Sequence, residues 1–227
     1  QMIFQDPYSS LNPRMSALNI VAEPLHIHRI GSSAQNREAA YDIMDKVGLT
    51  REQARRFPHE FSGGQRQRIG IARALALRPE LIIADEPVSA LDASIQAQIL
   101  NLLGDLKSEF GLTYLFVSHD LNVIRHVSDR IAVMYLGRIV ELANQKNIFD
   151  RPVHPYTRLL LSAMPSMRPR TKKREELIFG EAAQTDNPGC SFKNRCDYKI
   201  DICDQVQPAL QLCEKGRWSA CHRAGVI

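Results

Sequence analysis

The chain has 227 residues, enough for one large domain or for a domain with an appendage. Its apolar content of 44% is ordinary for a globular protein, and the absence of any apolar run of about 18 residues predicts no membrane-spanning helix. The formal net charge of +4 is modest, and the first residues lack the pattern of a secretory signal.

The first part of the chain predicts a strand, a loop and two helices. Gln1 to Gln5 has the character of a strand end, and the prolines at 6–13 indicate a loop. Apolar side chains recur at helical spacing over 16–29. A second helix is expected over 34–48, where Gly48 lies near its end.

The stretch Phe61–Arg68 contains a hydroxyl group, two glycines and an amide, and it opens a helix expected from about Ser62 to Leu77. Helix N-termini expose unpaired N–H groups and the positive end of the helix dipole, so they bind phosphate well. Gly63 and Gly64 let the backbone approach an anion closely, and Ser62 can cap the helix or donate to a phosphate oxygen.

About twenty residues further on, an apolar strand over 81–85 ends in two adjacent carboxylates, Asp85 and Glu86. A strongly helical segment follows over 93–110, with Asp92 suited to cap its start and Gly111 its end.

The next elements complete an alternating pattern. Thr113–Val117 is β-branched and aromatic and predicts a buried strand, and 122–127 predicts a short helix. Residues 131–135 and 138–142 predict a hairpin that turns at Gly137. Strands that alternate with helices favour an α/β fold with a parallel sheet.

The character of the sequence changes after residue 150. An apolar helix is expected over 159–164, and 165–189 has the composition of a linker. The basic run Arg168–Arg174 is read as a solvated face, with an approach to anionic lipid or nucleic acid as the alternative.

All five cysteines follow this linker, at Cys190, Cys196, Cys203, Cys213 and Cys221. Their spacing lacks the C-x2-C pairs typical of structural zinc, and disulfides are not expected in a cytosolic chain. Four thiolates from a loop-rich segment can hold an iron–sulfur cluster, whereas small buried thiols without a partner are the plainer interpretation.

In their order along the chain, the motifs resemble those of the ATP-binding cassette (ABC) ATPases. The matching stretches are a Q-loop at Met2–Pro7, a signature at Phe61–Gln65, a Walker B strand at Leu81–Glu86, a D-loop at Ser89–Asp92 and a switch at Val117–Asp120. The resemblance implies a P-loop NTPase-like core of parallel sheet and helices over 1–150. Within it, a helical subdomain spans 13–60 and the signature, Walker B and switch elements span 61–150.

The resemblance also implies roles for individual residues. Glu86 would polarise the attacking water and His119 would reach the γ-phosphate, while Asp85 and Gln5 would hold Mg²⁺. The residues implied to contact ATP are Gln5, Ser62, Gly63, Gly64, Gln65, Asp85 and Asp92.

In this family two ATPases form a head-to-tail dimer, so Ser62 to Gln65 would touch the nucleotide held by a homologous partner. The other implied partners are two transmembrane permease subunits and an extracytoplasmic peptide-binding protein, with no nucleic acid. This places the chain at the cytoplasmic face of the bacterial membrane.

One departure from the family pattern concerns Walker A. The sequence contains no Gly-x-x-x-x-Gly-Lys-Ser/Thr and no Met at position 1, so we expect it to be an N-terminally truncated part of a longer chain. A short, degenerate subunit is the alternative.

The region 151–227 resembles the C-terminal extension of oligopeptide and dipeptide importer ATPases. The resemblance rests on Asn187–Cys196, on Ala220-Cys221 and on His154–Thr157. It implies a 4Fe–4S cluster whose ligands are Cys190, Cys196, Cys203 and Cys221. Cys213 falls outside that pattern as a spare thiol, His222 is a possible substitute ligand, and zinc or no metal remain alternatives.

We therefore expect an ATP-hydrolysing subunit of an importer for oligopeptides or dipeptides. An importer for nickel or another solute is one alternative, and a non-hydrolysing regulatory or structural subunit is another. An ABC-type DNA-repair ATPase would need long coiled coils, which the sequence lacks.

Overall fold

The computed structural model describes residues 1–164 and 188–226, and the chain forms two compact units, Gln1–Asp120 and Leu121–Ile227. The basic run at 168–174 and nearly all of the expected linker lie outside the described residues. The boundary after Asp120 separates two compact units of the chain. It does not test the domain boundary expected at residue 150, which stays a prediction.

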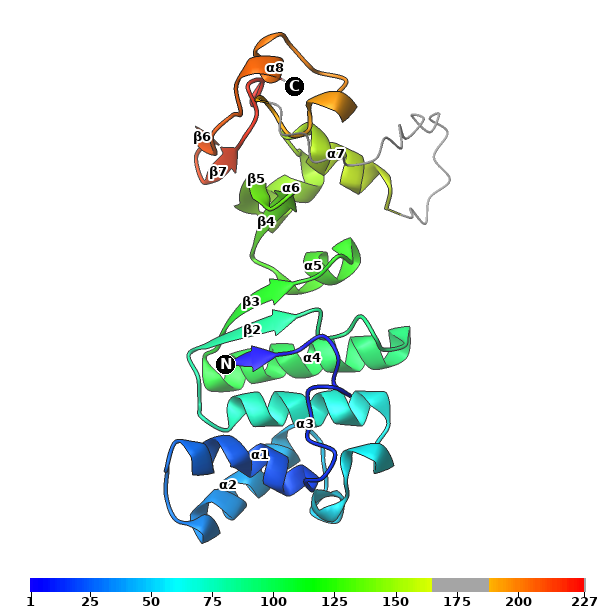
Figure 1. Ribbon diagram of the computed structural model, residues 1–227, viewed down its shortest axis with the longest axis vertical. Helices are drawn as coiled ribbons and strands as arrows, with labels where there is room; N and C mark the ends of the chain where they lie inside the picture. Colours follow the sequence, from blue (N-terminus) through cyan, green and yellow to red (C-terminus); the bar gives the residue numbers. More distant parts are fainter. Residues whose placement is uncertain (165–187, 227) are drawn as a thin grey trace. The chain divides into compact units, whose positions relative to one another are not determined.

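The first unit is built on a parallel sheet of β1 (Met2–Ile3), β2 (Leu81–Asp85) and β3 (Thr113–Val117), in that order (Figure 1). Ile3 lies opposite Ala84, and Ala84 lies opposite Phe116, so the strands end at the same edge of the sheet. The expected burial of β3 is wrong. Only β2 pairs with it among the described residues, and its Leu115 is 55% exposed.

Helices pack on this sheet and on one another. The bounds are α1 (Ala17–Ile27), α2 (Ser33–Lys46), α3 (Gly63–Leu75) and α4 (Ala93–Phe110), with short 3₁₀ turns η1 (Gln53–Arg55) and η2 (Pro58–Glu60). Helix α3 packs against β1 and α4, while α1 and α2 pack together on the side of α3 away from the sheet (Figure 1). The expected helix over 93–110 is confirmed, with Asp92 as its N-cap and Gly111, at φ 65°, as its C-cap.

The second unit contains a four-stranded antiparallel sheet in the order β4-β5-β7-β6 (Figure 1). Its elements are α5 (Leu121–Val127), β4 (Arg130–Tyr135), β5 (Arg138–Asn144), α6 (Gln145–Asp150), α7 (Pro155–Ser162), η3 (Lys193–Arg195), α8 (Ile202–Gln205), β6 (Gln211–Glu214) and β7 (Arg217–Ser219). The predicted hairpin is confirmed as β4 and β5, and both Leu136 and Gly137 have the positive φ of a type I′ turn. None of the helices in the described ranges is both long and apolar enough to cross a membrane.

Strands β6 and β7 were not expected, because the cysteine-containing segment has the composition of loops. Strand β7 pairs with β5, where Ser219 lies opposite Glu141. The C-terminal segment therefore extends a sheet that begins with the predicted hairpin. Strands of three and four residues are too short to show a periodicity in the sequence.

A buried carboxylate anchors the start of α7 to this sheet. Glu141 on β5 is fully buried, and its two oxygens accept hydrogen bonds from the backbone N–H groups of Val153 and His154, at 3.0 and 2.9 Å. These N–H groups lie at the helix start, where they have no partner within the helix and where a negative charge is favoured. Glu141 therefore fixes α7 on β5.

Aromatic rings join the cysteine-containing segment to the same sheet. The Phe192 ring lies 5.3 Å from that of Tyr135 on β4 and 5.5 Å from that of Tyr156 on α7, measured between centroids. The two tyrosine rings are 4.6 Å apart, and Phe192 is only 3% exposed. Such edge-to-face clusters stabilise beyond the area they bury, so Phe192 is a main anchor of the segment.

Candidate functional site

Three predicted site residues meet at the carboxyl edge of the parallel sheet. Gln5 follows β1, Glu86 follows β2 and His119 follows β3. The Gln5 Nε2 donates a hydrogen bond to Glu86 Oε2 at 2.7 Å, and His119 Nδ1 lies 2.8 Å from Glu86 Oε1. Parallel strands place the residues after their carboxyl ends side by side, which is where open α/β sheets bind ligands.

The electrostatics of this cluster favour a charged pair. The hydrogen bond from His119 is the main cause that lowers the pKa of the Glu86 carboxyl, and the bonds from Ser89 and Gln5 act in the same direction against partial burial. The hydrogen bond and the charge of Glu86 raise the pKa of His119. The arrangement can therefore hold a negative carboxylate beside a proton-carrying imidazole.

Glu86 also has an unusual backbone conformation. Its φ is +43°, although it carries a side chain. Its N–H donates to Val117 O at 2.9 Å, and its carbonyl accepts from the Ser89 N–H and hydroxyl, at 3.2 and 3.1 Å. Strain of this kind is found mostly at functional sites, and here the surrounding bonds hold the carboxylate in place.

Asp85 is the last residue of β2 and is half-buried, directly before Glu86. Asp92 lies further along the same loop, where its Oδ1 accepts from the Ile95 N–H at 3.0 Å. The expected capping of α4 by Asp92 is confirmed. Oxygen donors such as the Asp85 carboxylate and the Gln5 amide are the ligands that Mg²⁺ prefers.

The start of α3 has the capping arrangement expected from its sequence. The Ser62 hydroxyl accepts from the Gln65 N–H at 3.4 Å, and the Gln65 side chain accepts from the Ser62 N–H at 3.1 Å. A Cβ added to Gly64 would lie 2.5 Å from Ile95 Cγ2, whereas one on Gly63 would lie 3.4 Å from Leu91. Gly64 is therefore required for the close packing of α3 on α4.

The four cysteines expected to act together lie near one another in the second unit. Burial raises the pKa of the Cys196 thiol to about 11, and the charges of Cys221, Cys190 and Cys203 add to this increase. Burial is also the main cause of the raised pKa of Cys190 and of Cys221, with smaller effects of neighbouring thiols. Cys203 is itself buried.

These thiols do not converge on one point. Within residues 1–164 and 188–226, no three side chains of His, Cys, Asp or Glu form a group that could hold a metal ion. All five cysteines are free thiols. The donor chemistry suits soft metals or an iron–sulfur cluster, but the geometry of a metal centre is not formed.

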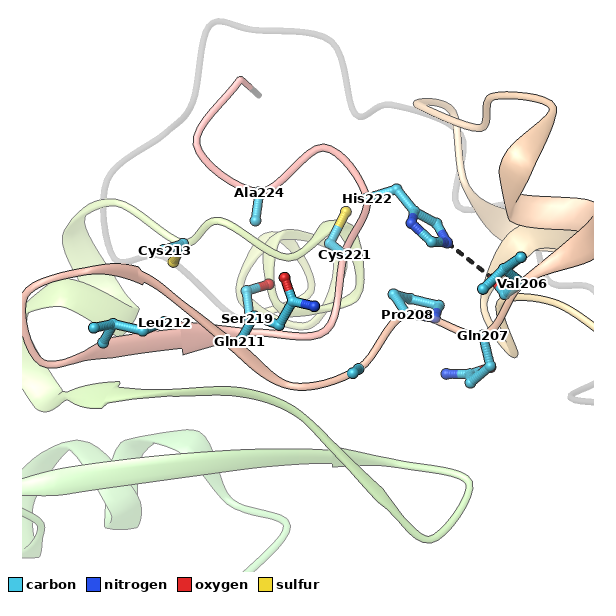
Figure 2. A pocket seen from close by; sticks show the side chains of 11 residues that line it. Val206, Gln207, Pro208, Gln211, Leu212, Cys213, Ser219, Cys221, His222 and Ala224 are labelled. Carbon is cyan, nitrogen blue, oxygen red and sulfur yellow. Dashed lines mark hydrogen bonds between the residues drawn. The ribbon is translucent and has the colours of Figure 1, made fainter.

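Cys213 stands apart from the other four. Its Sγ donates to Arg217 O at 3.5 Å within the β6–β7 turn, and it lines a pocket of about 480 Å³ together with Cys221 and His222. Figure 2 shows the sulfur atoms of Cys213 and Cys221 on different sides of this pocket. The Nε2 of His222 lies 2.9 Å from Val206 O, so this nitrogen is already engaged.

Comparisons with known proteins agree with this arrangement. Residues 1–89 match the family described as "ABC transporter", and residues 140–203 match "Oligopeptide/dipeptide transporter, C-terminal region". The chain is 51% identical over 226 residues to "Oligopeptide transport ATP-binding protein AppF" of Bacillus subtilis, covering 98% of this chain and 69% of that protein. It is 53% identical over 224 residues to "Probable peptide ABC transporter ATP-binding protein y4tS" of Sinorhizobium fredii, covering 98% of this chain and 64% of that protein.

A solved structure described as "Dimeric structure of a post-hydrolysis state of the ATP-binding cassette MJ0796 bound to ADP and Pi" shares the fold. It superposes with a TM-score of 0.56 at 36% identity, covering 63% of this chain and 62% of that one. The predicted fold class, an α/β ABC ATPase core, is confirmed.

Proposed function

Because the chain belongs to the ATP-binding subunits of oligopeptide and dipeptide ABC transporters, we propose that it hydrolyses ATP to power the uptake of oligopeptides or dipeptides across the cytoplasmic membrane. The observation that carries the proposal is the hydrogen-bonded set of Gln5, Glu86 and His119 at the carboxyl edge of the parallel sheet. The names of the two relatives support peptides as the transported solute.

In the proposed reaction, Glu86 orients and polarises the attacking water, since its carboxylate is held in the ionised form. Asp85 and Gln5 would hold Mg²⁺, which supplies charge neutralisation at the β- and γ-phosphates when bound. His119, which lies beside Glu86, would contact the γ-phosphate. The Gln5 and His119 bonds use one acceptor site on each carboxylate oxygen of Glu86, so a change in either bond would alter how the carboxylate meets water.

The start of α3 is proposed to serve a second subunit. Ser62, Gly63, Gly64 and Gln65 lie at a helix N-terminus, which favours phosphate. We assign them to the nucleotide of a homologous ATPase in a head-to-tail dimer, and the dimeric state of the similar MJ0796 cassette supports this assignment. Two transmembrane permease subunits, an extracytoplasmic peptide-binding protein and a place at the cytoplasmic face of the membrane complete the proposal.

We assign Cys190, Cys196, Cys203 and Cys221 to a 4Fe–4S cluster that stabilises the C-terminal extension. Their mutual electrostatic influence and the loop-rich backbone around them support this assignment. Cluster binding would have to bring the four neighbouring thiols into one ligand set, since in the described residues no three of them form a group that could hold a metal ion. Zinc remains the competing metal.

The ATPase assignment is tested in the assembled importer with Glu86→Gln. We expect ATP turnover to fall by at least about a hundredfold, as for loss of a general base, while ATP-bound dimers persist. Glu80→Gln is the matched control, because Glu80 directly precedes β2 at its opposite end and its side chain is exposed. Normal turnover with Glu86→Gln would refute the catalytic role, and uptake of nickel in place of labelled dipeptides would refute the substrate class.

The cluster is tested by anaerobic purification and metal analysis. We expect iron, a broad brown absorbance, and loss of both in Cys196→Ser. Cys213→Ser should retain the iron, because the Cys213 thiol donates to the Arg217 carbonyl on β7 and lies outside the expected ligand set. Zinc in place of iron, or equal iron in both variants, would contradict the assignment.

A further inference from the structure

The loop that carries Gln5 is held by α3 at two places. Arg66 lies with its guanidinium 4.8 Å from the centre of the Tyr8 ring, and its Nε donates to Pro58 O at 2.7 Å. Arg73 donates from Nη1 to Ser10 O at 2.6 Å and lies 5.8 Å from the centre of the Phe4 ring. Both arginines therefore bind the segment between β1 and α1.

The spacing of the two arginines makes them act as a pair. Arg66 and Arg73 are seven residues apart, which is two helical turns and about 10.5 Å along the axis of α3. They lie on the same face of the helix and contact the loop at separate points. Because α3 contacts the loop at two separate points, both a rotation and a translation of α3 would displace the loop.

Arg73 is a charged residue in a half-buried position. Burial lowers the pKa of its guanidinium, which the charge of Glu23 partly offsets. Removing a charged group from water costs free energy, so its bond to Ser10 O must be retained for the arrangement to be favourable.

The loop is internally braced between these contacts and Gln5. Asp6 accepts from the Tyr8 N–H at 2.8 Å through Oδ1, and its carbonyl accepts from the Ser10 N–H at 3.2 Å. A displacement of Tyr8 and Ser10 is thus passed to Asp6, next to Gln5. Gln5 in turn holds Glu86 at 2.7 Å.

We infer that Arg66 and Arg73 are positioning residues that couple the start of α3 to Gln5 and Glu86. The inference rests on the proposed function, in which Ser62–Gly64 grips the nucleotide of the partner ATPase. When that nucleotide moves α3, the two arginines move the loop, and the bond between Gln5 and Glu86 changes. Occupancy of the partner's site thereby controls when Glu86 is free to act on water. The route consists of contiguous contacts within one unit, and energetic coupling along it can be measured directly.

The test is a double-mutant cycle on ATP hydrolysis by the assembled importer, with Arg73→Met and Gln5→Ala alone and combined. Met retains the apolar stem of the side chain and loses the guanidinium. We expect Arg73→Met to lower kcat about tenfold and to change the KM for ATP by less than about threefold, since the nucleotide contacts remain. In the Gln5→Ala background the same substitution should lower kcat by less than about twofold, because its target is already gone.

Arg68→Met is the matched control. Arg68 lies on the same helix and also donates from Nη1 to a backbone carbonyl at 2.6 Å, but its acceptor is Val47 at the end of α2. Its effect on kcat should be the same with and without Gln5. Arg66→Met should behave like Arg73→Met, and it replaces that variant if Arg73→Met does not fold.

Additive effects of Arg73→Met and Gln5→Ala would overturn the inference, and so would an unchanged kcat in both arginine variants. A purely structural role of Arg73 predicts this additivity. Failure of the proposed function is recognised separately, because Glu86→Gln would then leave hydrolysis unchanged.

Discussion

We expect His154 to make the second unit sensitive to acid. The residue is 2% exposed, and its Nδ1 accepts a hydrogen bond from the Tyr156 N–H at 3.1 Å as the N-cap of α7. Protonation would turn His154 Nδ1 into a donor that faces the Tyr156 N–H, and the hydrogen bond that caps α7 would be lost. Burial lowers the pKa of His154 to about 4, although a hydrogen bond with the Ala220 backbone acts in the opposite direction.

The size of the effect follows from the two pKa values. The histidine pKa is about 6.5 in an unfolded chain, so between pH 6.5 and 4 the unfolded state binds more protons than the folded state. Stability must therefore decrease as the pH falls through this window, and the decrease levels off below about pH 4. Between pH 7 and pH 5 this single group removes about 2 kcal/mol from the free energy of unfolding.

Urea unfolding at pH 7 and pH 5 measures this loss. The chain has a single tryptophan, Trp218 on β7, so its fluorescence follows the unit that contains His154. His154→Asn retains a good N-cap acceptor without the titrating ring, and we expect it to remove about 2 kcal/mol of the pH-dependent loss. His126→Asn, at an exposed histidine of the same unit, leaves His154 in place and should retain the loss. An equal pH dependence in wild type and His154→Asn would refute the reasoning.

Substitutions at Gly64, Phe192 and Gly189 test packing. Gly64→Ala should lower the free energy of unfolding by about 1–3 kcal/mol in thermal unfolding, because its Cβ would lie 2.5 Å from Ile95 Cγ2. Adding Ile95→Ala to the same chain should restore part of this loss. Unchanged stability of Gly64→Ala would contradict the packing argument. Phe192→Ala should cost about 3–5 kcal/mol by Trp218 fluorescence and Phe192→Leu clearly less, whereas equal losses would argue against the ring cluster. At Gly189, φ is +110° and an added Cβ would lie 2.5 Å from Cys203 O, whereas at Gly216 φ is +73° and no atom lies within 4 Å of an added Cβ. Gly189→Ala should therefore destabilise the protein more than Gly216→Ala. The reverse order would refute the steric argument.

Local chemistry explains what the sequence predicts well. The start of α4 at Asp92 and its end at Gly111 depend on one side chain and one positive φ, and both follow from residue type. The hairpin at Gly137 is predicted for the same reason. The structure also brings Gln5, Glu86 and His119 together, because each follows a strand of the parallel sheet, and their roles stay predictions.

Contacts between distant segments explain what the sequence could not predict. The hydrogen bonds of Glu141 to the start of α7 depend on β5 lying next to Val153 and His154, which follow Glu141 by more than ten positions in the sequence. The pairing of β7 with β5 brings together two segments between which four of the five cysteines lie. The hold of Arg73 on Ser10 likewise needs the position of α3 against the loop, although the seven-residue spacing of Arg66 and Arg73 was available as a signal.

The glycine pair of the signature shows how packing and function share one motif. From the sequence, Gly63 and Gly64 both serve the close approach of an anion. In the structure, Gly64 is demanded by the packing of α3 on α4, since even a methyl group would clash with Ile95, whereas Gly63 has only ordinary contact with Leu91. Packing alone therefore accounts for Gly64 but leaves Gly63 unexplained. The case for a phosphate at this helix start accordingly rests on Gly63, together with the Ser62 hydroxyl beside it.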